Sequence, residues 1–210
     1  MVINNYACIV TTHIFFFFAI LVIQIFHFRV GFLPLISTLP NWIGDLTGLT
    51  SLALGNNQFG AQLPDSFKKL TNLRLLGLDN NNQLKGNIND LLGNMRQVEY
   101  LYLEDNFFDG ELDGLIDRWP KLLELDVSNN ILDGKVPNAL MNHPTLMVAD
   151  LHRNVFGHQF PDDIFENTKL EFLALHNNII SGTIPDRVAF LSNLKHLDLS
   201  LNKLTGTIPD

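Results

Sequence analysis

The chain has 210 residues, of which 46% are apolar and 17% are charged, a composition typical of a folded protein. Its formal net charge is −8, and its 14 lysines and arginines are spread along the chain, which argues against binding to nucleic acid. The single cysteine, Cys8, excludes an intrachain disulfide and a cysteine-rich metal site. Basic peptides, carbohydrates and neutral protein surfaces remain as possible partners.

The N-terminal segment, residues 1–35, is more apolar than the rest of the chain. The stretch from Ala7 to Phe28 has few polar residues, and its length is close to the roughly 20 residues with which a helix crosses a bilayer. We therefore expect an apolar N-terminal helix that anchors the protein, with a membrane or extracellular location. Two alternatives stay open. One is a cleaved signal peptide, although no Lys or Arg precedes the apolar core. The other is an artefactual N-terminus on a cytoplasmic scaffold protein.

Residues 36–210 repeat with a period of 24 residues. Apolar residues recur at positions 4, 7 and 9 of every unit, as in Leu194, Leu197 and Leu199. The alternation at positions 7 and 9 predicts a short strand with one buried face, which pairs in parallel with its copy in the next unit. The units are a half repeat at 36–45, full repeats at 46–69, 70–94, 95–118, 119–142, 143–166 and 167–190, and a truncated repeat at 191–210.

An asparagine occupies position 12, where the chain must turn after the strand. A buried amide has two donor hydrogens and an acceptor oxygen, so it can satisfy backbone groups of its own and adjacent units. Unit 70–94 has one extra residue, and both Asn81 and Asn82 fit the position there. We interpret this column as a structural ladder formed by Asn57, Asn106, Asn130, Asn154, Asn178 and Asn202.

The second half of each unit has an apolar residue at position 14, often a glycine at position 16, and then an apolar residue followed by proline. The last unit, 191–210, reads LSNLKHLDLSLNKLTGTIPD and shows the whole pattern. This pattern resembles the plant-type leucine-rich repeat of receptor-like kinases, receptor-like proteins and polygalacturonase inhibitors, over residues 36–210. The resemblance implies an α/β repeat solenoid, a right-handed superhelix with a concave parallel β-sheet, that recognises ligands without catalysis.

The chain departs from the family pattern at three places. The N-terminal cap with its cysteine pair is missing, and Asn89 and Asp113 stand where proline is expected. The last unit stops at Asp210 without a capping segment, although a terminal repeat needs a polar outer face. We therefore expect the chain to be a fragment of a longer protein.

Residues at positions 6, 8, 10 and 11 are expected to point out of the concave face in columns that run across the sheet. Asp at position 8 and Ser at position 10 are stock residues of the family, whereas aromatic, histidine and arginine side chains are departures. Tyr and Arg are enriched at recognition hot spots, although single exposed aromatic residues are also common on ordinary surfaces. We predict a ligand-binding patch formed by Tyr100, Tyr102, Glu104, Glu124, Asp126, Asp150, His152, Arg153, Phe172 and His176.

Catalytic and metal-binding interpretations find less support. Asp126 and Asp150 are expected one strand spacing apart, near the roughly 5 Å carboxyl separation of a retaining glycosidase, but an open sheet offers no cleft. His152 and His176 could share a metal ion with Asp150, but exposed histidines are more often solvated. No phosphate-binding loop, metalloprotease motif, nucleophile elbow or kinase motif is present in the sequence. We predict no enzyme activity, no cofactor and no metal, and a protein, peptide or glycan as the partner.

Overall fold

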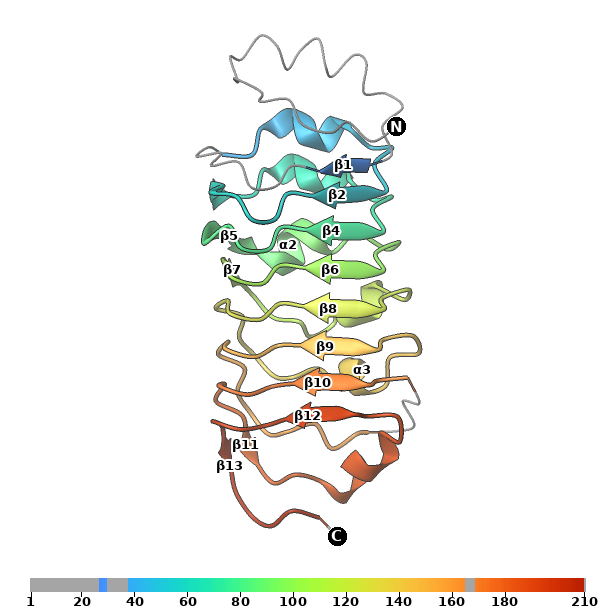
Figure 1. The fold of residues 1–210 in the computed structure, drawn as a ribbon, viewed down its shortest axis with the longest axis vertical. Helices are drawn as coiled ribbons and strands as arrows, with labels where there is room; N and C mark the ends of the chain where they lie inside the picture. Colours follow the sequence, from blue (N-terminus) through green and yellow to red (C-terminus); the bar gives the residue numbers. More distant parts are fainter. Residues whose placement is uncertain (1–26, 30–37, 165–168, 210) are drawn as a thin grey trace.

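The computed structural model describes residues 27–29, 38–164 and 169–209, which form an elongated stack of coils (Figure 1). Each coil contributes one three-residue strand to a single sheet, and neighbouring strands follow one another down the stack. The strands in order are β1 (His27–Arg29), β2 (Ser51–Ala53), β4 (Leu75–Gly77), β6 (Tyr100–Tyr102), β8 (Glu124–Asp126), β9 (Val148–Asp150), β10 (Phe172–Ala174) and β12 (His196–Asp198).

All strand pairs in this sheet are parallel, and the register repeats at every step. Leu52 pairs with Leu76, and Leu76 pairs with Leu101, so the buried position-7 residues lie side by side down the stack. Residues at positions 6 and 8 flank each buried residue and are partly exposed in most strands. The solenoid with a parallel sheet that the sequence predicted is therefore confirmed.

Strand β1 lies inside the segment 1–35 that the sequence assigned to the apolar N-terminal segment. Its residues His27, Phe28 and Arg29 pair in parallel with the three residues of β2, at the same 24-residue offset as the later units. The sheet thus starts upstream of the predicted boundary at residue 36. The expected N-terminal helix falls on residues 1–26, outside the described residues. Within the described part of the chain, no helix is long and apolar enough to cross a membrane.

The second half of each coil forms short, less regular elements. Small parallel ladders join β3 (Gly60–Gln62), β5 (Gln83–Asn87) and β7 (Phe107–Asp109), and also β11 (Ser181–Gly182) and β13 (Lys203–Leu204). The helical turns are η2 (Asn41–Asp45), η3 (Asp65–Lys69), α2 (Ile88–Leu92), η4 (Ile116–Arg118), α3 (Asn138–Met141) and η5 (Asp186–Phe190).

Proline precedes several of these helical turns because its restricted φ suits the residue that enters a turn. Pro64 and Pro185 occupy the N-cap positions of η3 and η5 in extended conformation. Unit 70–94 has Asn89 in place of this proline. There the side chain of Asn87 accepts hydrogen bonds from the backbone N–H groups of Asn89 and Asp90, so a side-chain cap starts α2 instead.

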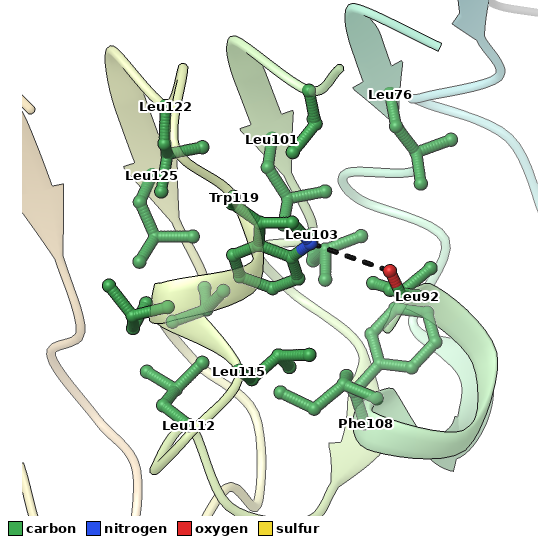
Figure 2. Packing of buried hydrophobic residues seen from close by; sticks show 14 of the residues in the cluster. Leu76, Leu92, Leu101, Leu103, Phe108, Leu112, Leu115, Trp119, Leu122 and Leu125 are labelled. Atoms are coloured by element: carbon green, nitrogen blue, oxygen red, sulfur yellow. Dashed lines mark hydrogen bonds between the residues drawn. The ribbon is translucent and has the colours of Figure 1, made fainter. Parts of the chain in front are cut away.

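The core is one continuous apolar cluster between the sheet and the helical turns. Figure 2 shows its centre, where Trp119 is fully buried among leucines of successive coils. The indole Nε1–H of Trp119 donates a long hydrogen bond, 3.4 Å, to the carbonyl oxygen of Leu92 in the preceding coil (Figure 2). Leu101 and Leu125 project from neighbouring strands toward this ring, so adjacent coils share the same interior.

The position-12 asparagines bridge successive coils. The Nδ2 group of Asn130 donates to the carbonyl oxygens of Leu103 in the preceding coil and Val127 in its own, at 2.9 and 3.2 Å. Its Oδ1 accepts the backbone N–H of Phe108 at 2.8 Å. In unit 70–94 the buried residue that makes these contacts is Asn81, whereas Asn82 is exposed.

The ladder is interrupted after the unit with the extra residue. Asn106 donates to carbonyl oxygens of two coils in the usual way, but its buried Oδ1 accepts no hydrogen bond from any described residue. The other position-12 asparagines that accept a bond take it from the backbone N–H 22 residues earlier. The residue 22 positions before Asn106 is Leu84, which lies in the unit with the extra residue.

Candidate ligand-binding face

The parallel register brings the predicted site residues into columns across β6 to β10. Tyr100 pairs with Glu124, and Tyr102 pairs with Asp126. Asp126 in turn pairs with Asp150 on β9. These side chains are partly exposed, while the position-7 residues between them are buried. The sequence-predicted residues on β6, β8 and β9 therefore lie next to one another across the sheet.

Tyr102 and Glu124 form a short contact on this face. The hydroxyl of Tyr102 donates a hydrogen bond to Oε2 of Glu124 at 2.5 Å. Burial, followed by this hydrogen bond and the charge of Glu124, raises the pKa of Tyr102 well above its usual value. The phenol thus stays protonated as a donor, and the bond fixes the orientation of both side chains.

Glu104 is a half-buried carboxyl group at position 10, close to other carboxylates. Burial, and next the charge of Asp126, raise the pKa of Glu104 to about 8. Its Oε2 is buried and accepts no hydrogen bond within the described residues. Burial also raises the pKa of Asp126, although the backbone N–H of Ser128 donates to its Oδ1 at 3.0 Å. Negative charge on this part of the face is therefore costly without a cationic partner.

Two histidines stack at the C-terminal side of the face. The rings of His152 and His176 lie 4.4 Å apart between centroids, at an interplanar angle of 10°. Nδ1 of His152 lies 2.6 Å from Oδ1 of Asp150, and Nδ1 of His176 lies 3.3 Å from Oδ2 of Asp198. No group of three or more potential metal ligands forms a cluster among the described residues.

Arg153 follows His152 at position 11, where the seven units from residue 46 onward adopt a left-handed backbone conformation. Its φ is 52°, a region that Asn and Asp tolerate better than other residues with a side chain. Five of the seven residues at this position are Asn or Asp, and only Arg153 and Leu201 are not. The conformation is therefore a property of the coil, and Arg153 is an exposed arginine in a backbone conformation that asparagine suits better.

Two residues that the sequence-based prediction left out belong to the same face. His196 stacks on Phe172, with ring centroids 4.4 Å apart and an interplanar angle of 7°. Asp198 faces His176 and was set aside because Asp is the stock residue at position 8. The 24-residue period could have identified both residues. It places His196 next to Phe172 and Asp198 next to Ala174 on the neighbouring strand.

Comparisons with known proteins agree with this geometry. The family described as Leucine Rich Repeat matches residues 48–70, 121–143 and 193–210. The leucine-rich repeat ectodomain of the membrane receptor kinase GASSHO1/SCHENGEN3 from Arabidopsis thaliana, solved with CASPARIAN STRIP INTEGRITY FACTOR 2, superposes with a TM-score of 0.82 at 31% identity over 88% of this chain. The chain is a leucine-rich repeat protein. No curated protein sequence matches it closely enough to count as a relative.

Other solved structures are also similar to this chain. The Arabidopsis receptor kinase HAESA, in complex with the peptide hormone IDA and the co-receptor SERK1, gives a TM-score of 0.77 at 31% identity over 82% of this chain. A plant ice-binding protein gives 0.63 at 26% identity over 87% of this chain and 66% of its own. The leucine-rich repeat chain spans only 22% of the GASSHO1/SCHENGEN3 chain and 29% of the HAESA chain.

Proposed function

We propose that this leucine-rich repeat chain is a non-catalytic recognition module that binds a peptide on its concave face. The observation that carries the proposal is the connected column of partly exposed aromatic and charged side chains across β6 to β10, including Tyr100, Tyr102 and Phe172. Rigid aromatic groups beside fixed hydrogen-bonding groups are typical of binding surfaces. The HAESA and GASSHO1/SCHENGEN3 ectodomains were solved with a peptide hormone and a named factor, which supports a receptor-like role for this chain.

The charge distribution favours a peptide over a neutral glycan. Carboxyl groups of Glu104, Glu124 and Asp126 lie over β6 and β8, whereas the following coil carries Arg153 beside the Asp150–His152 pair. An extended ligand that crosses the strands would meet these carboxyl groups at one end and the guanidinium of Arg153 at the other. A peptide can carry groups of both charges at those separations, and an uncharged oligosaccharide cannot.

A peptide library displayed on phage tests this proposal. We expect clones selected on the wild-type protein to lose capture by the Tyr100→Ala, Phe172→Ala double variant, whose circular dichroism should be unchanged. Phe107→Ala is the matched control, because Phe107 is an exposed aromatic residue outside the concave columns. Selected clones that bind the double variant as well as the wild type would show that the concave face is not the binding surface. Enrichment on a glycan array alone would replace the peptide with a glycan.

We further propose that the protein acts outside the cell and is tethered through its apolar N-terminal segment. The extracellular domains among the similar structures and the apolar composition of residues 1–35 support this location. We expect a tagged full-length chain to stay in the membrane pellet after a carbonate wash. Release into the soluble fraction would instead favour the cytoplasmic scaffold.

A further inference from the structure

A second exposed surface lies beyond the C-terminal ends of the sheet strands, on the side where Figure 1 shows β7. Four large apolar side chains occupy position 13 in four consecutive coils. Their exposed fractions range from 44% to 51%, although most large apolar side chains of the chain are buried. We call them the apolar stripe: Phe107, Ile131, Val155 and Ile179.

Core packing does not account for these residues. The neighbouring position-14 residues, such as Phe108 and Leu132, are fully buried and fill the interior. Position 13 is polar in other coils of the same chain, where Gln58 and Lys203 stand. A polar residue therefore satisfies the fold at this position, so the fold itself does not require the four apolar residues. An exposed apolar column that recurs in four consecutive coils is a candidate interaction surface.

The spacing of the stripe limits what can cover it. Backbone hydrogen bonds link each coil to the next beside the stripe, as from Ile131 N–H to the carbonyl oxygen of Phe108 at 3.0 Å. Four side chains one coil spacing apart span about 14 Å. Apolar residues on successive turns of an α-helix span about 16 Å over three turns. Alternate residues of an extended strand would span about 20 Å. The helix fits the stripe and the strand does not.

The charges beside the stripe and its exposed apolar area favour a helix of a partner protein over a second copy of this chain. Asp109 and Asp133 stand two residues after Phe107 and Ile131, beside the first half of the stripe, and Asp105 stands two residues before Phe107. The nearby cations are Lys85, which pairs with Phe107, Arg153 before Val155, and Lys203 one coil beyond Ile179. Two copies, each with a net charge of −8, would repel one another. The stripe itself offers on the order of 200–300 Å² of apolar surface, well below the roughly 800 Å² per partner of a stable dimer.

We infer that the apolar stripe docks a short basic amphipathic helix of a partner protein, with its lysines or arginines beside Asp109 and Asp133. The helix places one apolar residue on each coil of the stripe, and its cationic flank neutralises the carboxylates. This surface is separate from the concave face, so the protein could hold a ligand and a partner helix at the same time.

Fluorescence anisotropy with a labelled synthetic peptide tests the inference. The probe has about 16 residues, with leucines at an i, i+3, i+7, i+10 spacing and lysines and alanines elsewhere. We expect Ile131→Gln with Val155→Gln to weaken its binding about tenfold or more. Gln58 shows that the fold accepts glutamine at position 13. Met147→Gln is the matched control, because Met147 is also exposed and lies outside the stripe.

Two further peptides and one hydrodynamic measurement complete the design. A scrambled peptide of the same composition and a peptide with glutamates in place of lysines should both bind much more weakly. Equal binding of the scrambled peptide, or of the wild type and the double glutamine variant, would overturn the inference. Dimerisation in sedimentation experiments that the glutamine pair abolishes would assign the stripe to a second copy instead. Because Tyr100→Ala and Phe172→Ala leave the stripe intact, they should not change peptide binding here.

Discussion

The asparagine ladder provides a matched pair of substitutions, Asn130→Ala and Asn106→Ala. Both side chains are buried, with exposed fractions of 8% and 5%, and both donate to carbonyl oxygens of two successive coils. They differ in one contact. Oδ1 of Asn130 accepts the backbone N–H of Phe108, whereas Oδ1 of Asn106 has no partner among the described residues.

The expected losses follow from which backbone groups each substitution leaves without a partner. The Leu103 carbonyl oxygen accepts from both Asn106 and Asn130, and the Val127 carbonyl oxygen accepts from both Asn130 and Asn154. Removing one amide therefore leaves each carbonyl with one donor. The lost donor bonds cost about 2 kcal/mol in either variant. Asn130→Ala also leaves a buried N–H unpaired, which adds about 1–3 kcal/mol.

Urea unfolding followed by the fluorescence of the buried Trp119 and by far-UV circular dichroism measures both losses. We expect the free energy of unfolding to fall by about 3–5 kcal/mol in Asn130→Ala and by about 2 kcal/mol in Asn106→Ala. The comparison holds if both variants keep the wild-type m-value, because the same surface is then exposed on unfolding. Equal losses, or a larger loss in Asn106→Ala, would refute the assignment of the Oδ1 contact as the stabilising difference.

Three other predictions concern the concave face. Arg153→Asn should raise the free energy of unfolding by about 1 kcal/mol because asparagine tolerates the left-handed backbone, and Asn177→Arg should lower it by a similar amount; urea midpoints measure both. The folded-state pKa of Glu104 is raised to about 8 from 4.5, so its destabilising effect is absent below about pH 4.5 and grows as pH rises toward 8. Glu104→Gln should therefore stabilise the protein at pH 8.5 by about 1–2 kcal/mol, after allowance for solvent screening, and leave stability at pH 4 unchanged in urea titrations. Tyr102→Phe should cost about 1 kcal/mol in thermal unfolding through loss of its bond to Glu124, and an unchanged Tm would argue against that bond.

The sequence predicts the coils because the core imposes the same demand on every unit. Positions 7 and 9 must be apolar in each strand, and position 12 must supply an amide, so a 24-residue period is visible without structure. Once the register is known, the columns that hold Tyr100, Asp126 and His152 follow by counting. The partly exposed face was therefore predictable as a set of positions.

Other features were not predictable, for physical reasons that differ. Strand β1 was hidden because it continues the apolar stretch that ends at Phe28, and the three residues His27, Phe28 and Arg29 are too few to show the alternation of a strand with one buried face. The stacking of His152 on His176 depends on side-chain rotamers, which spacing does not determine. The apolar stripe was visible as a column, but a sequence does not tell whether an apolar residue beside a core position is buried or exposed.

The extra residue of unit 70–94 shows why a solenoid can vary its surfaces so freely. Each coil contacts only its neighbours, so a local change need not propagate. The insertion accompanies a five-residue β5 and a side-chain cap at Asn87, yet Leu76 still pairs with Leu101 in the sheet. In the next coil, the buried Oδ1 of Asn106 accepts no hydrogen bond from the described residues. Side chains at positions 6, 8, 10, 11 and 13 contribute less to the hydrophobic core than the leucines do. Substitutions at these positions can therefore alter the concave face or the apolar stripe without disrupting the fold. A loss of binding in such variants then reports on the surface itself.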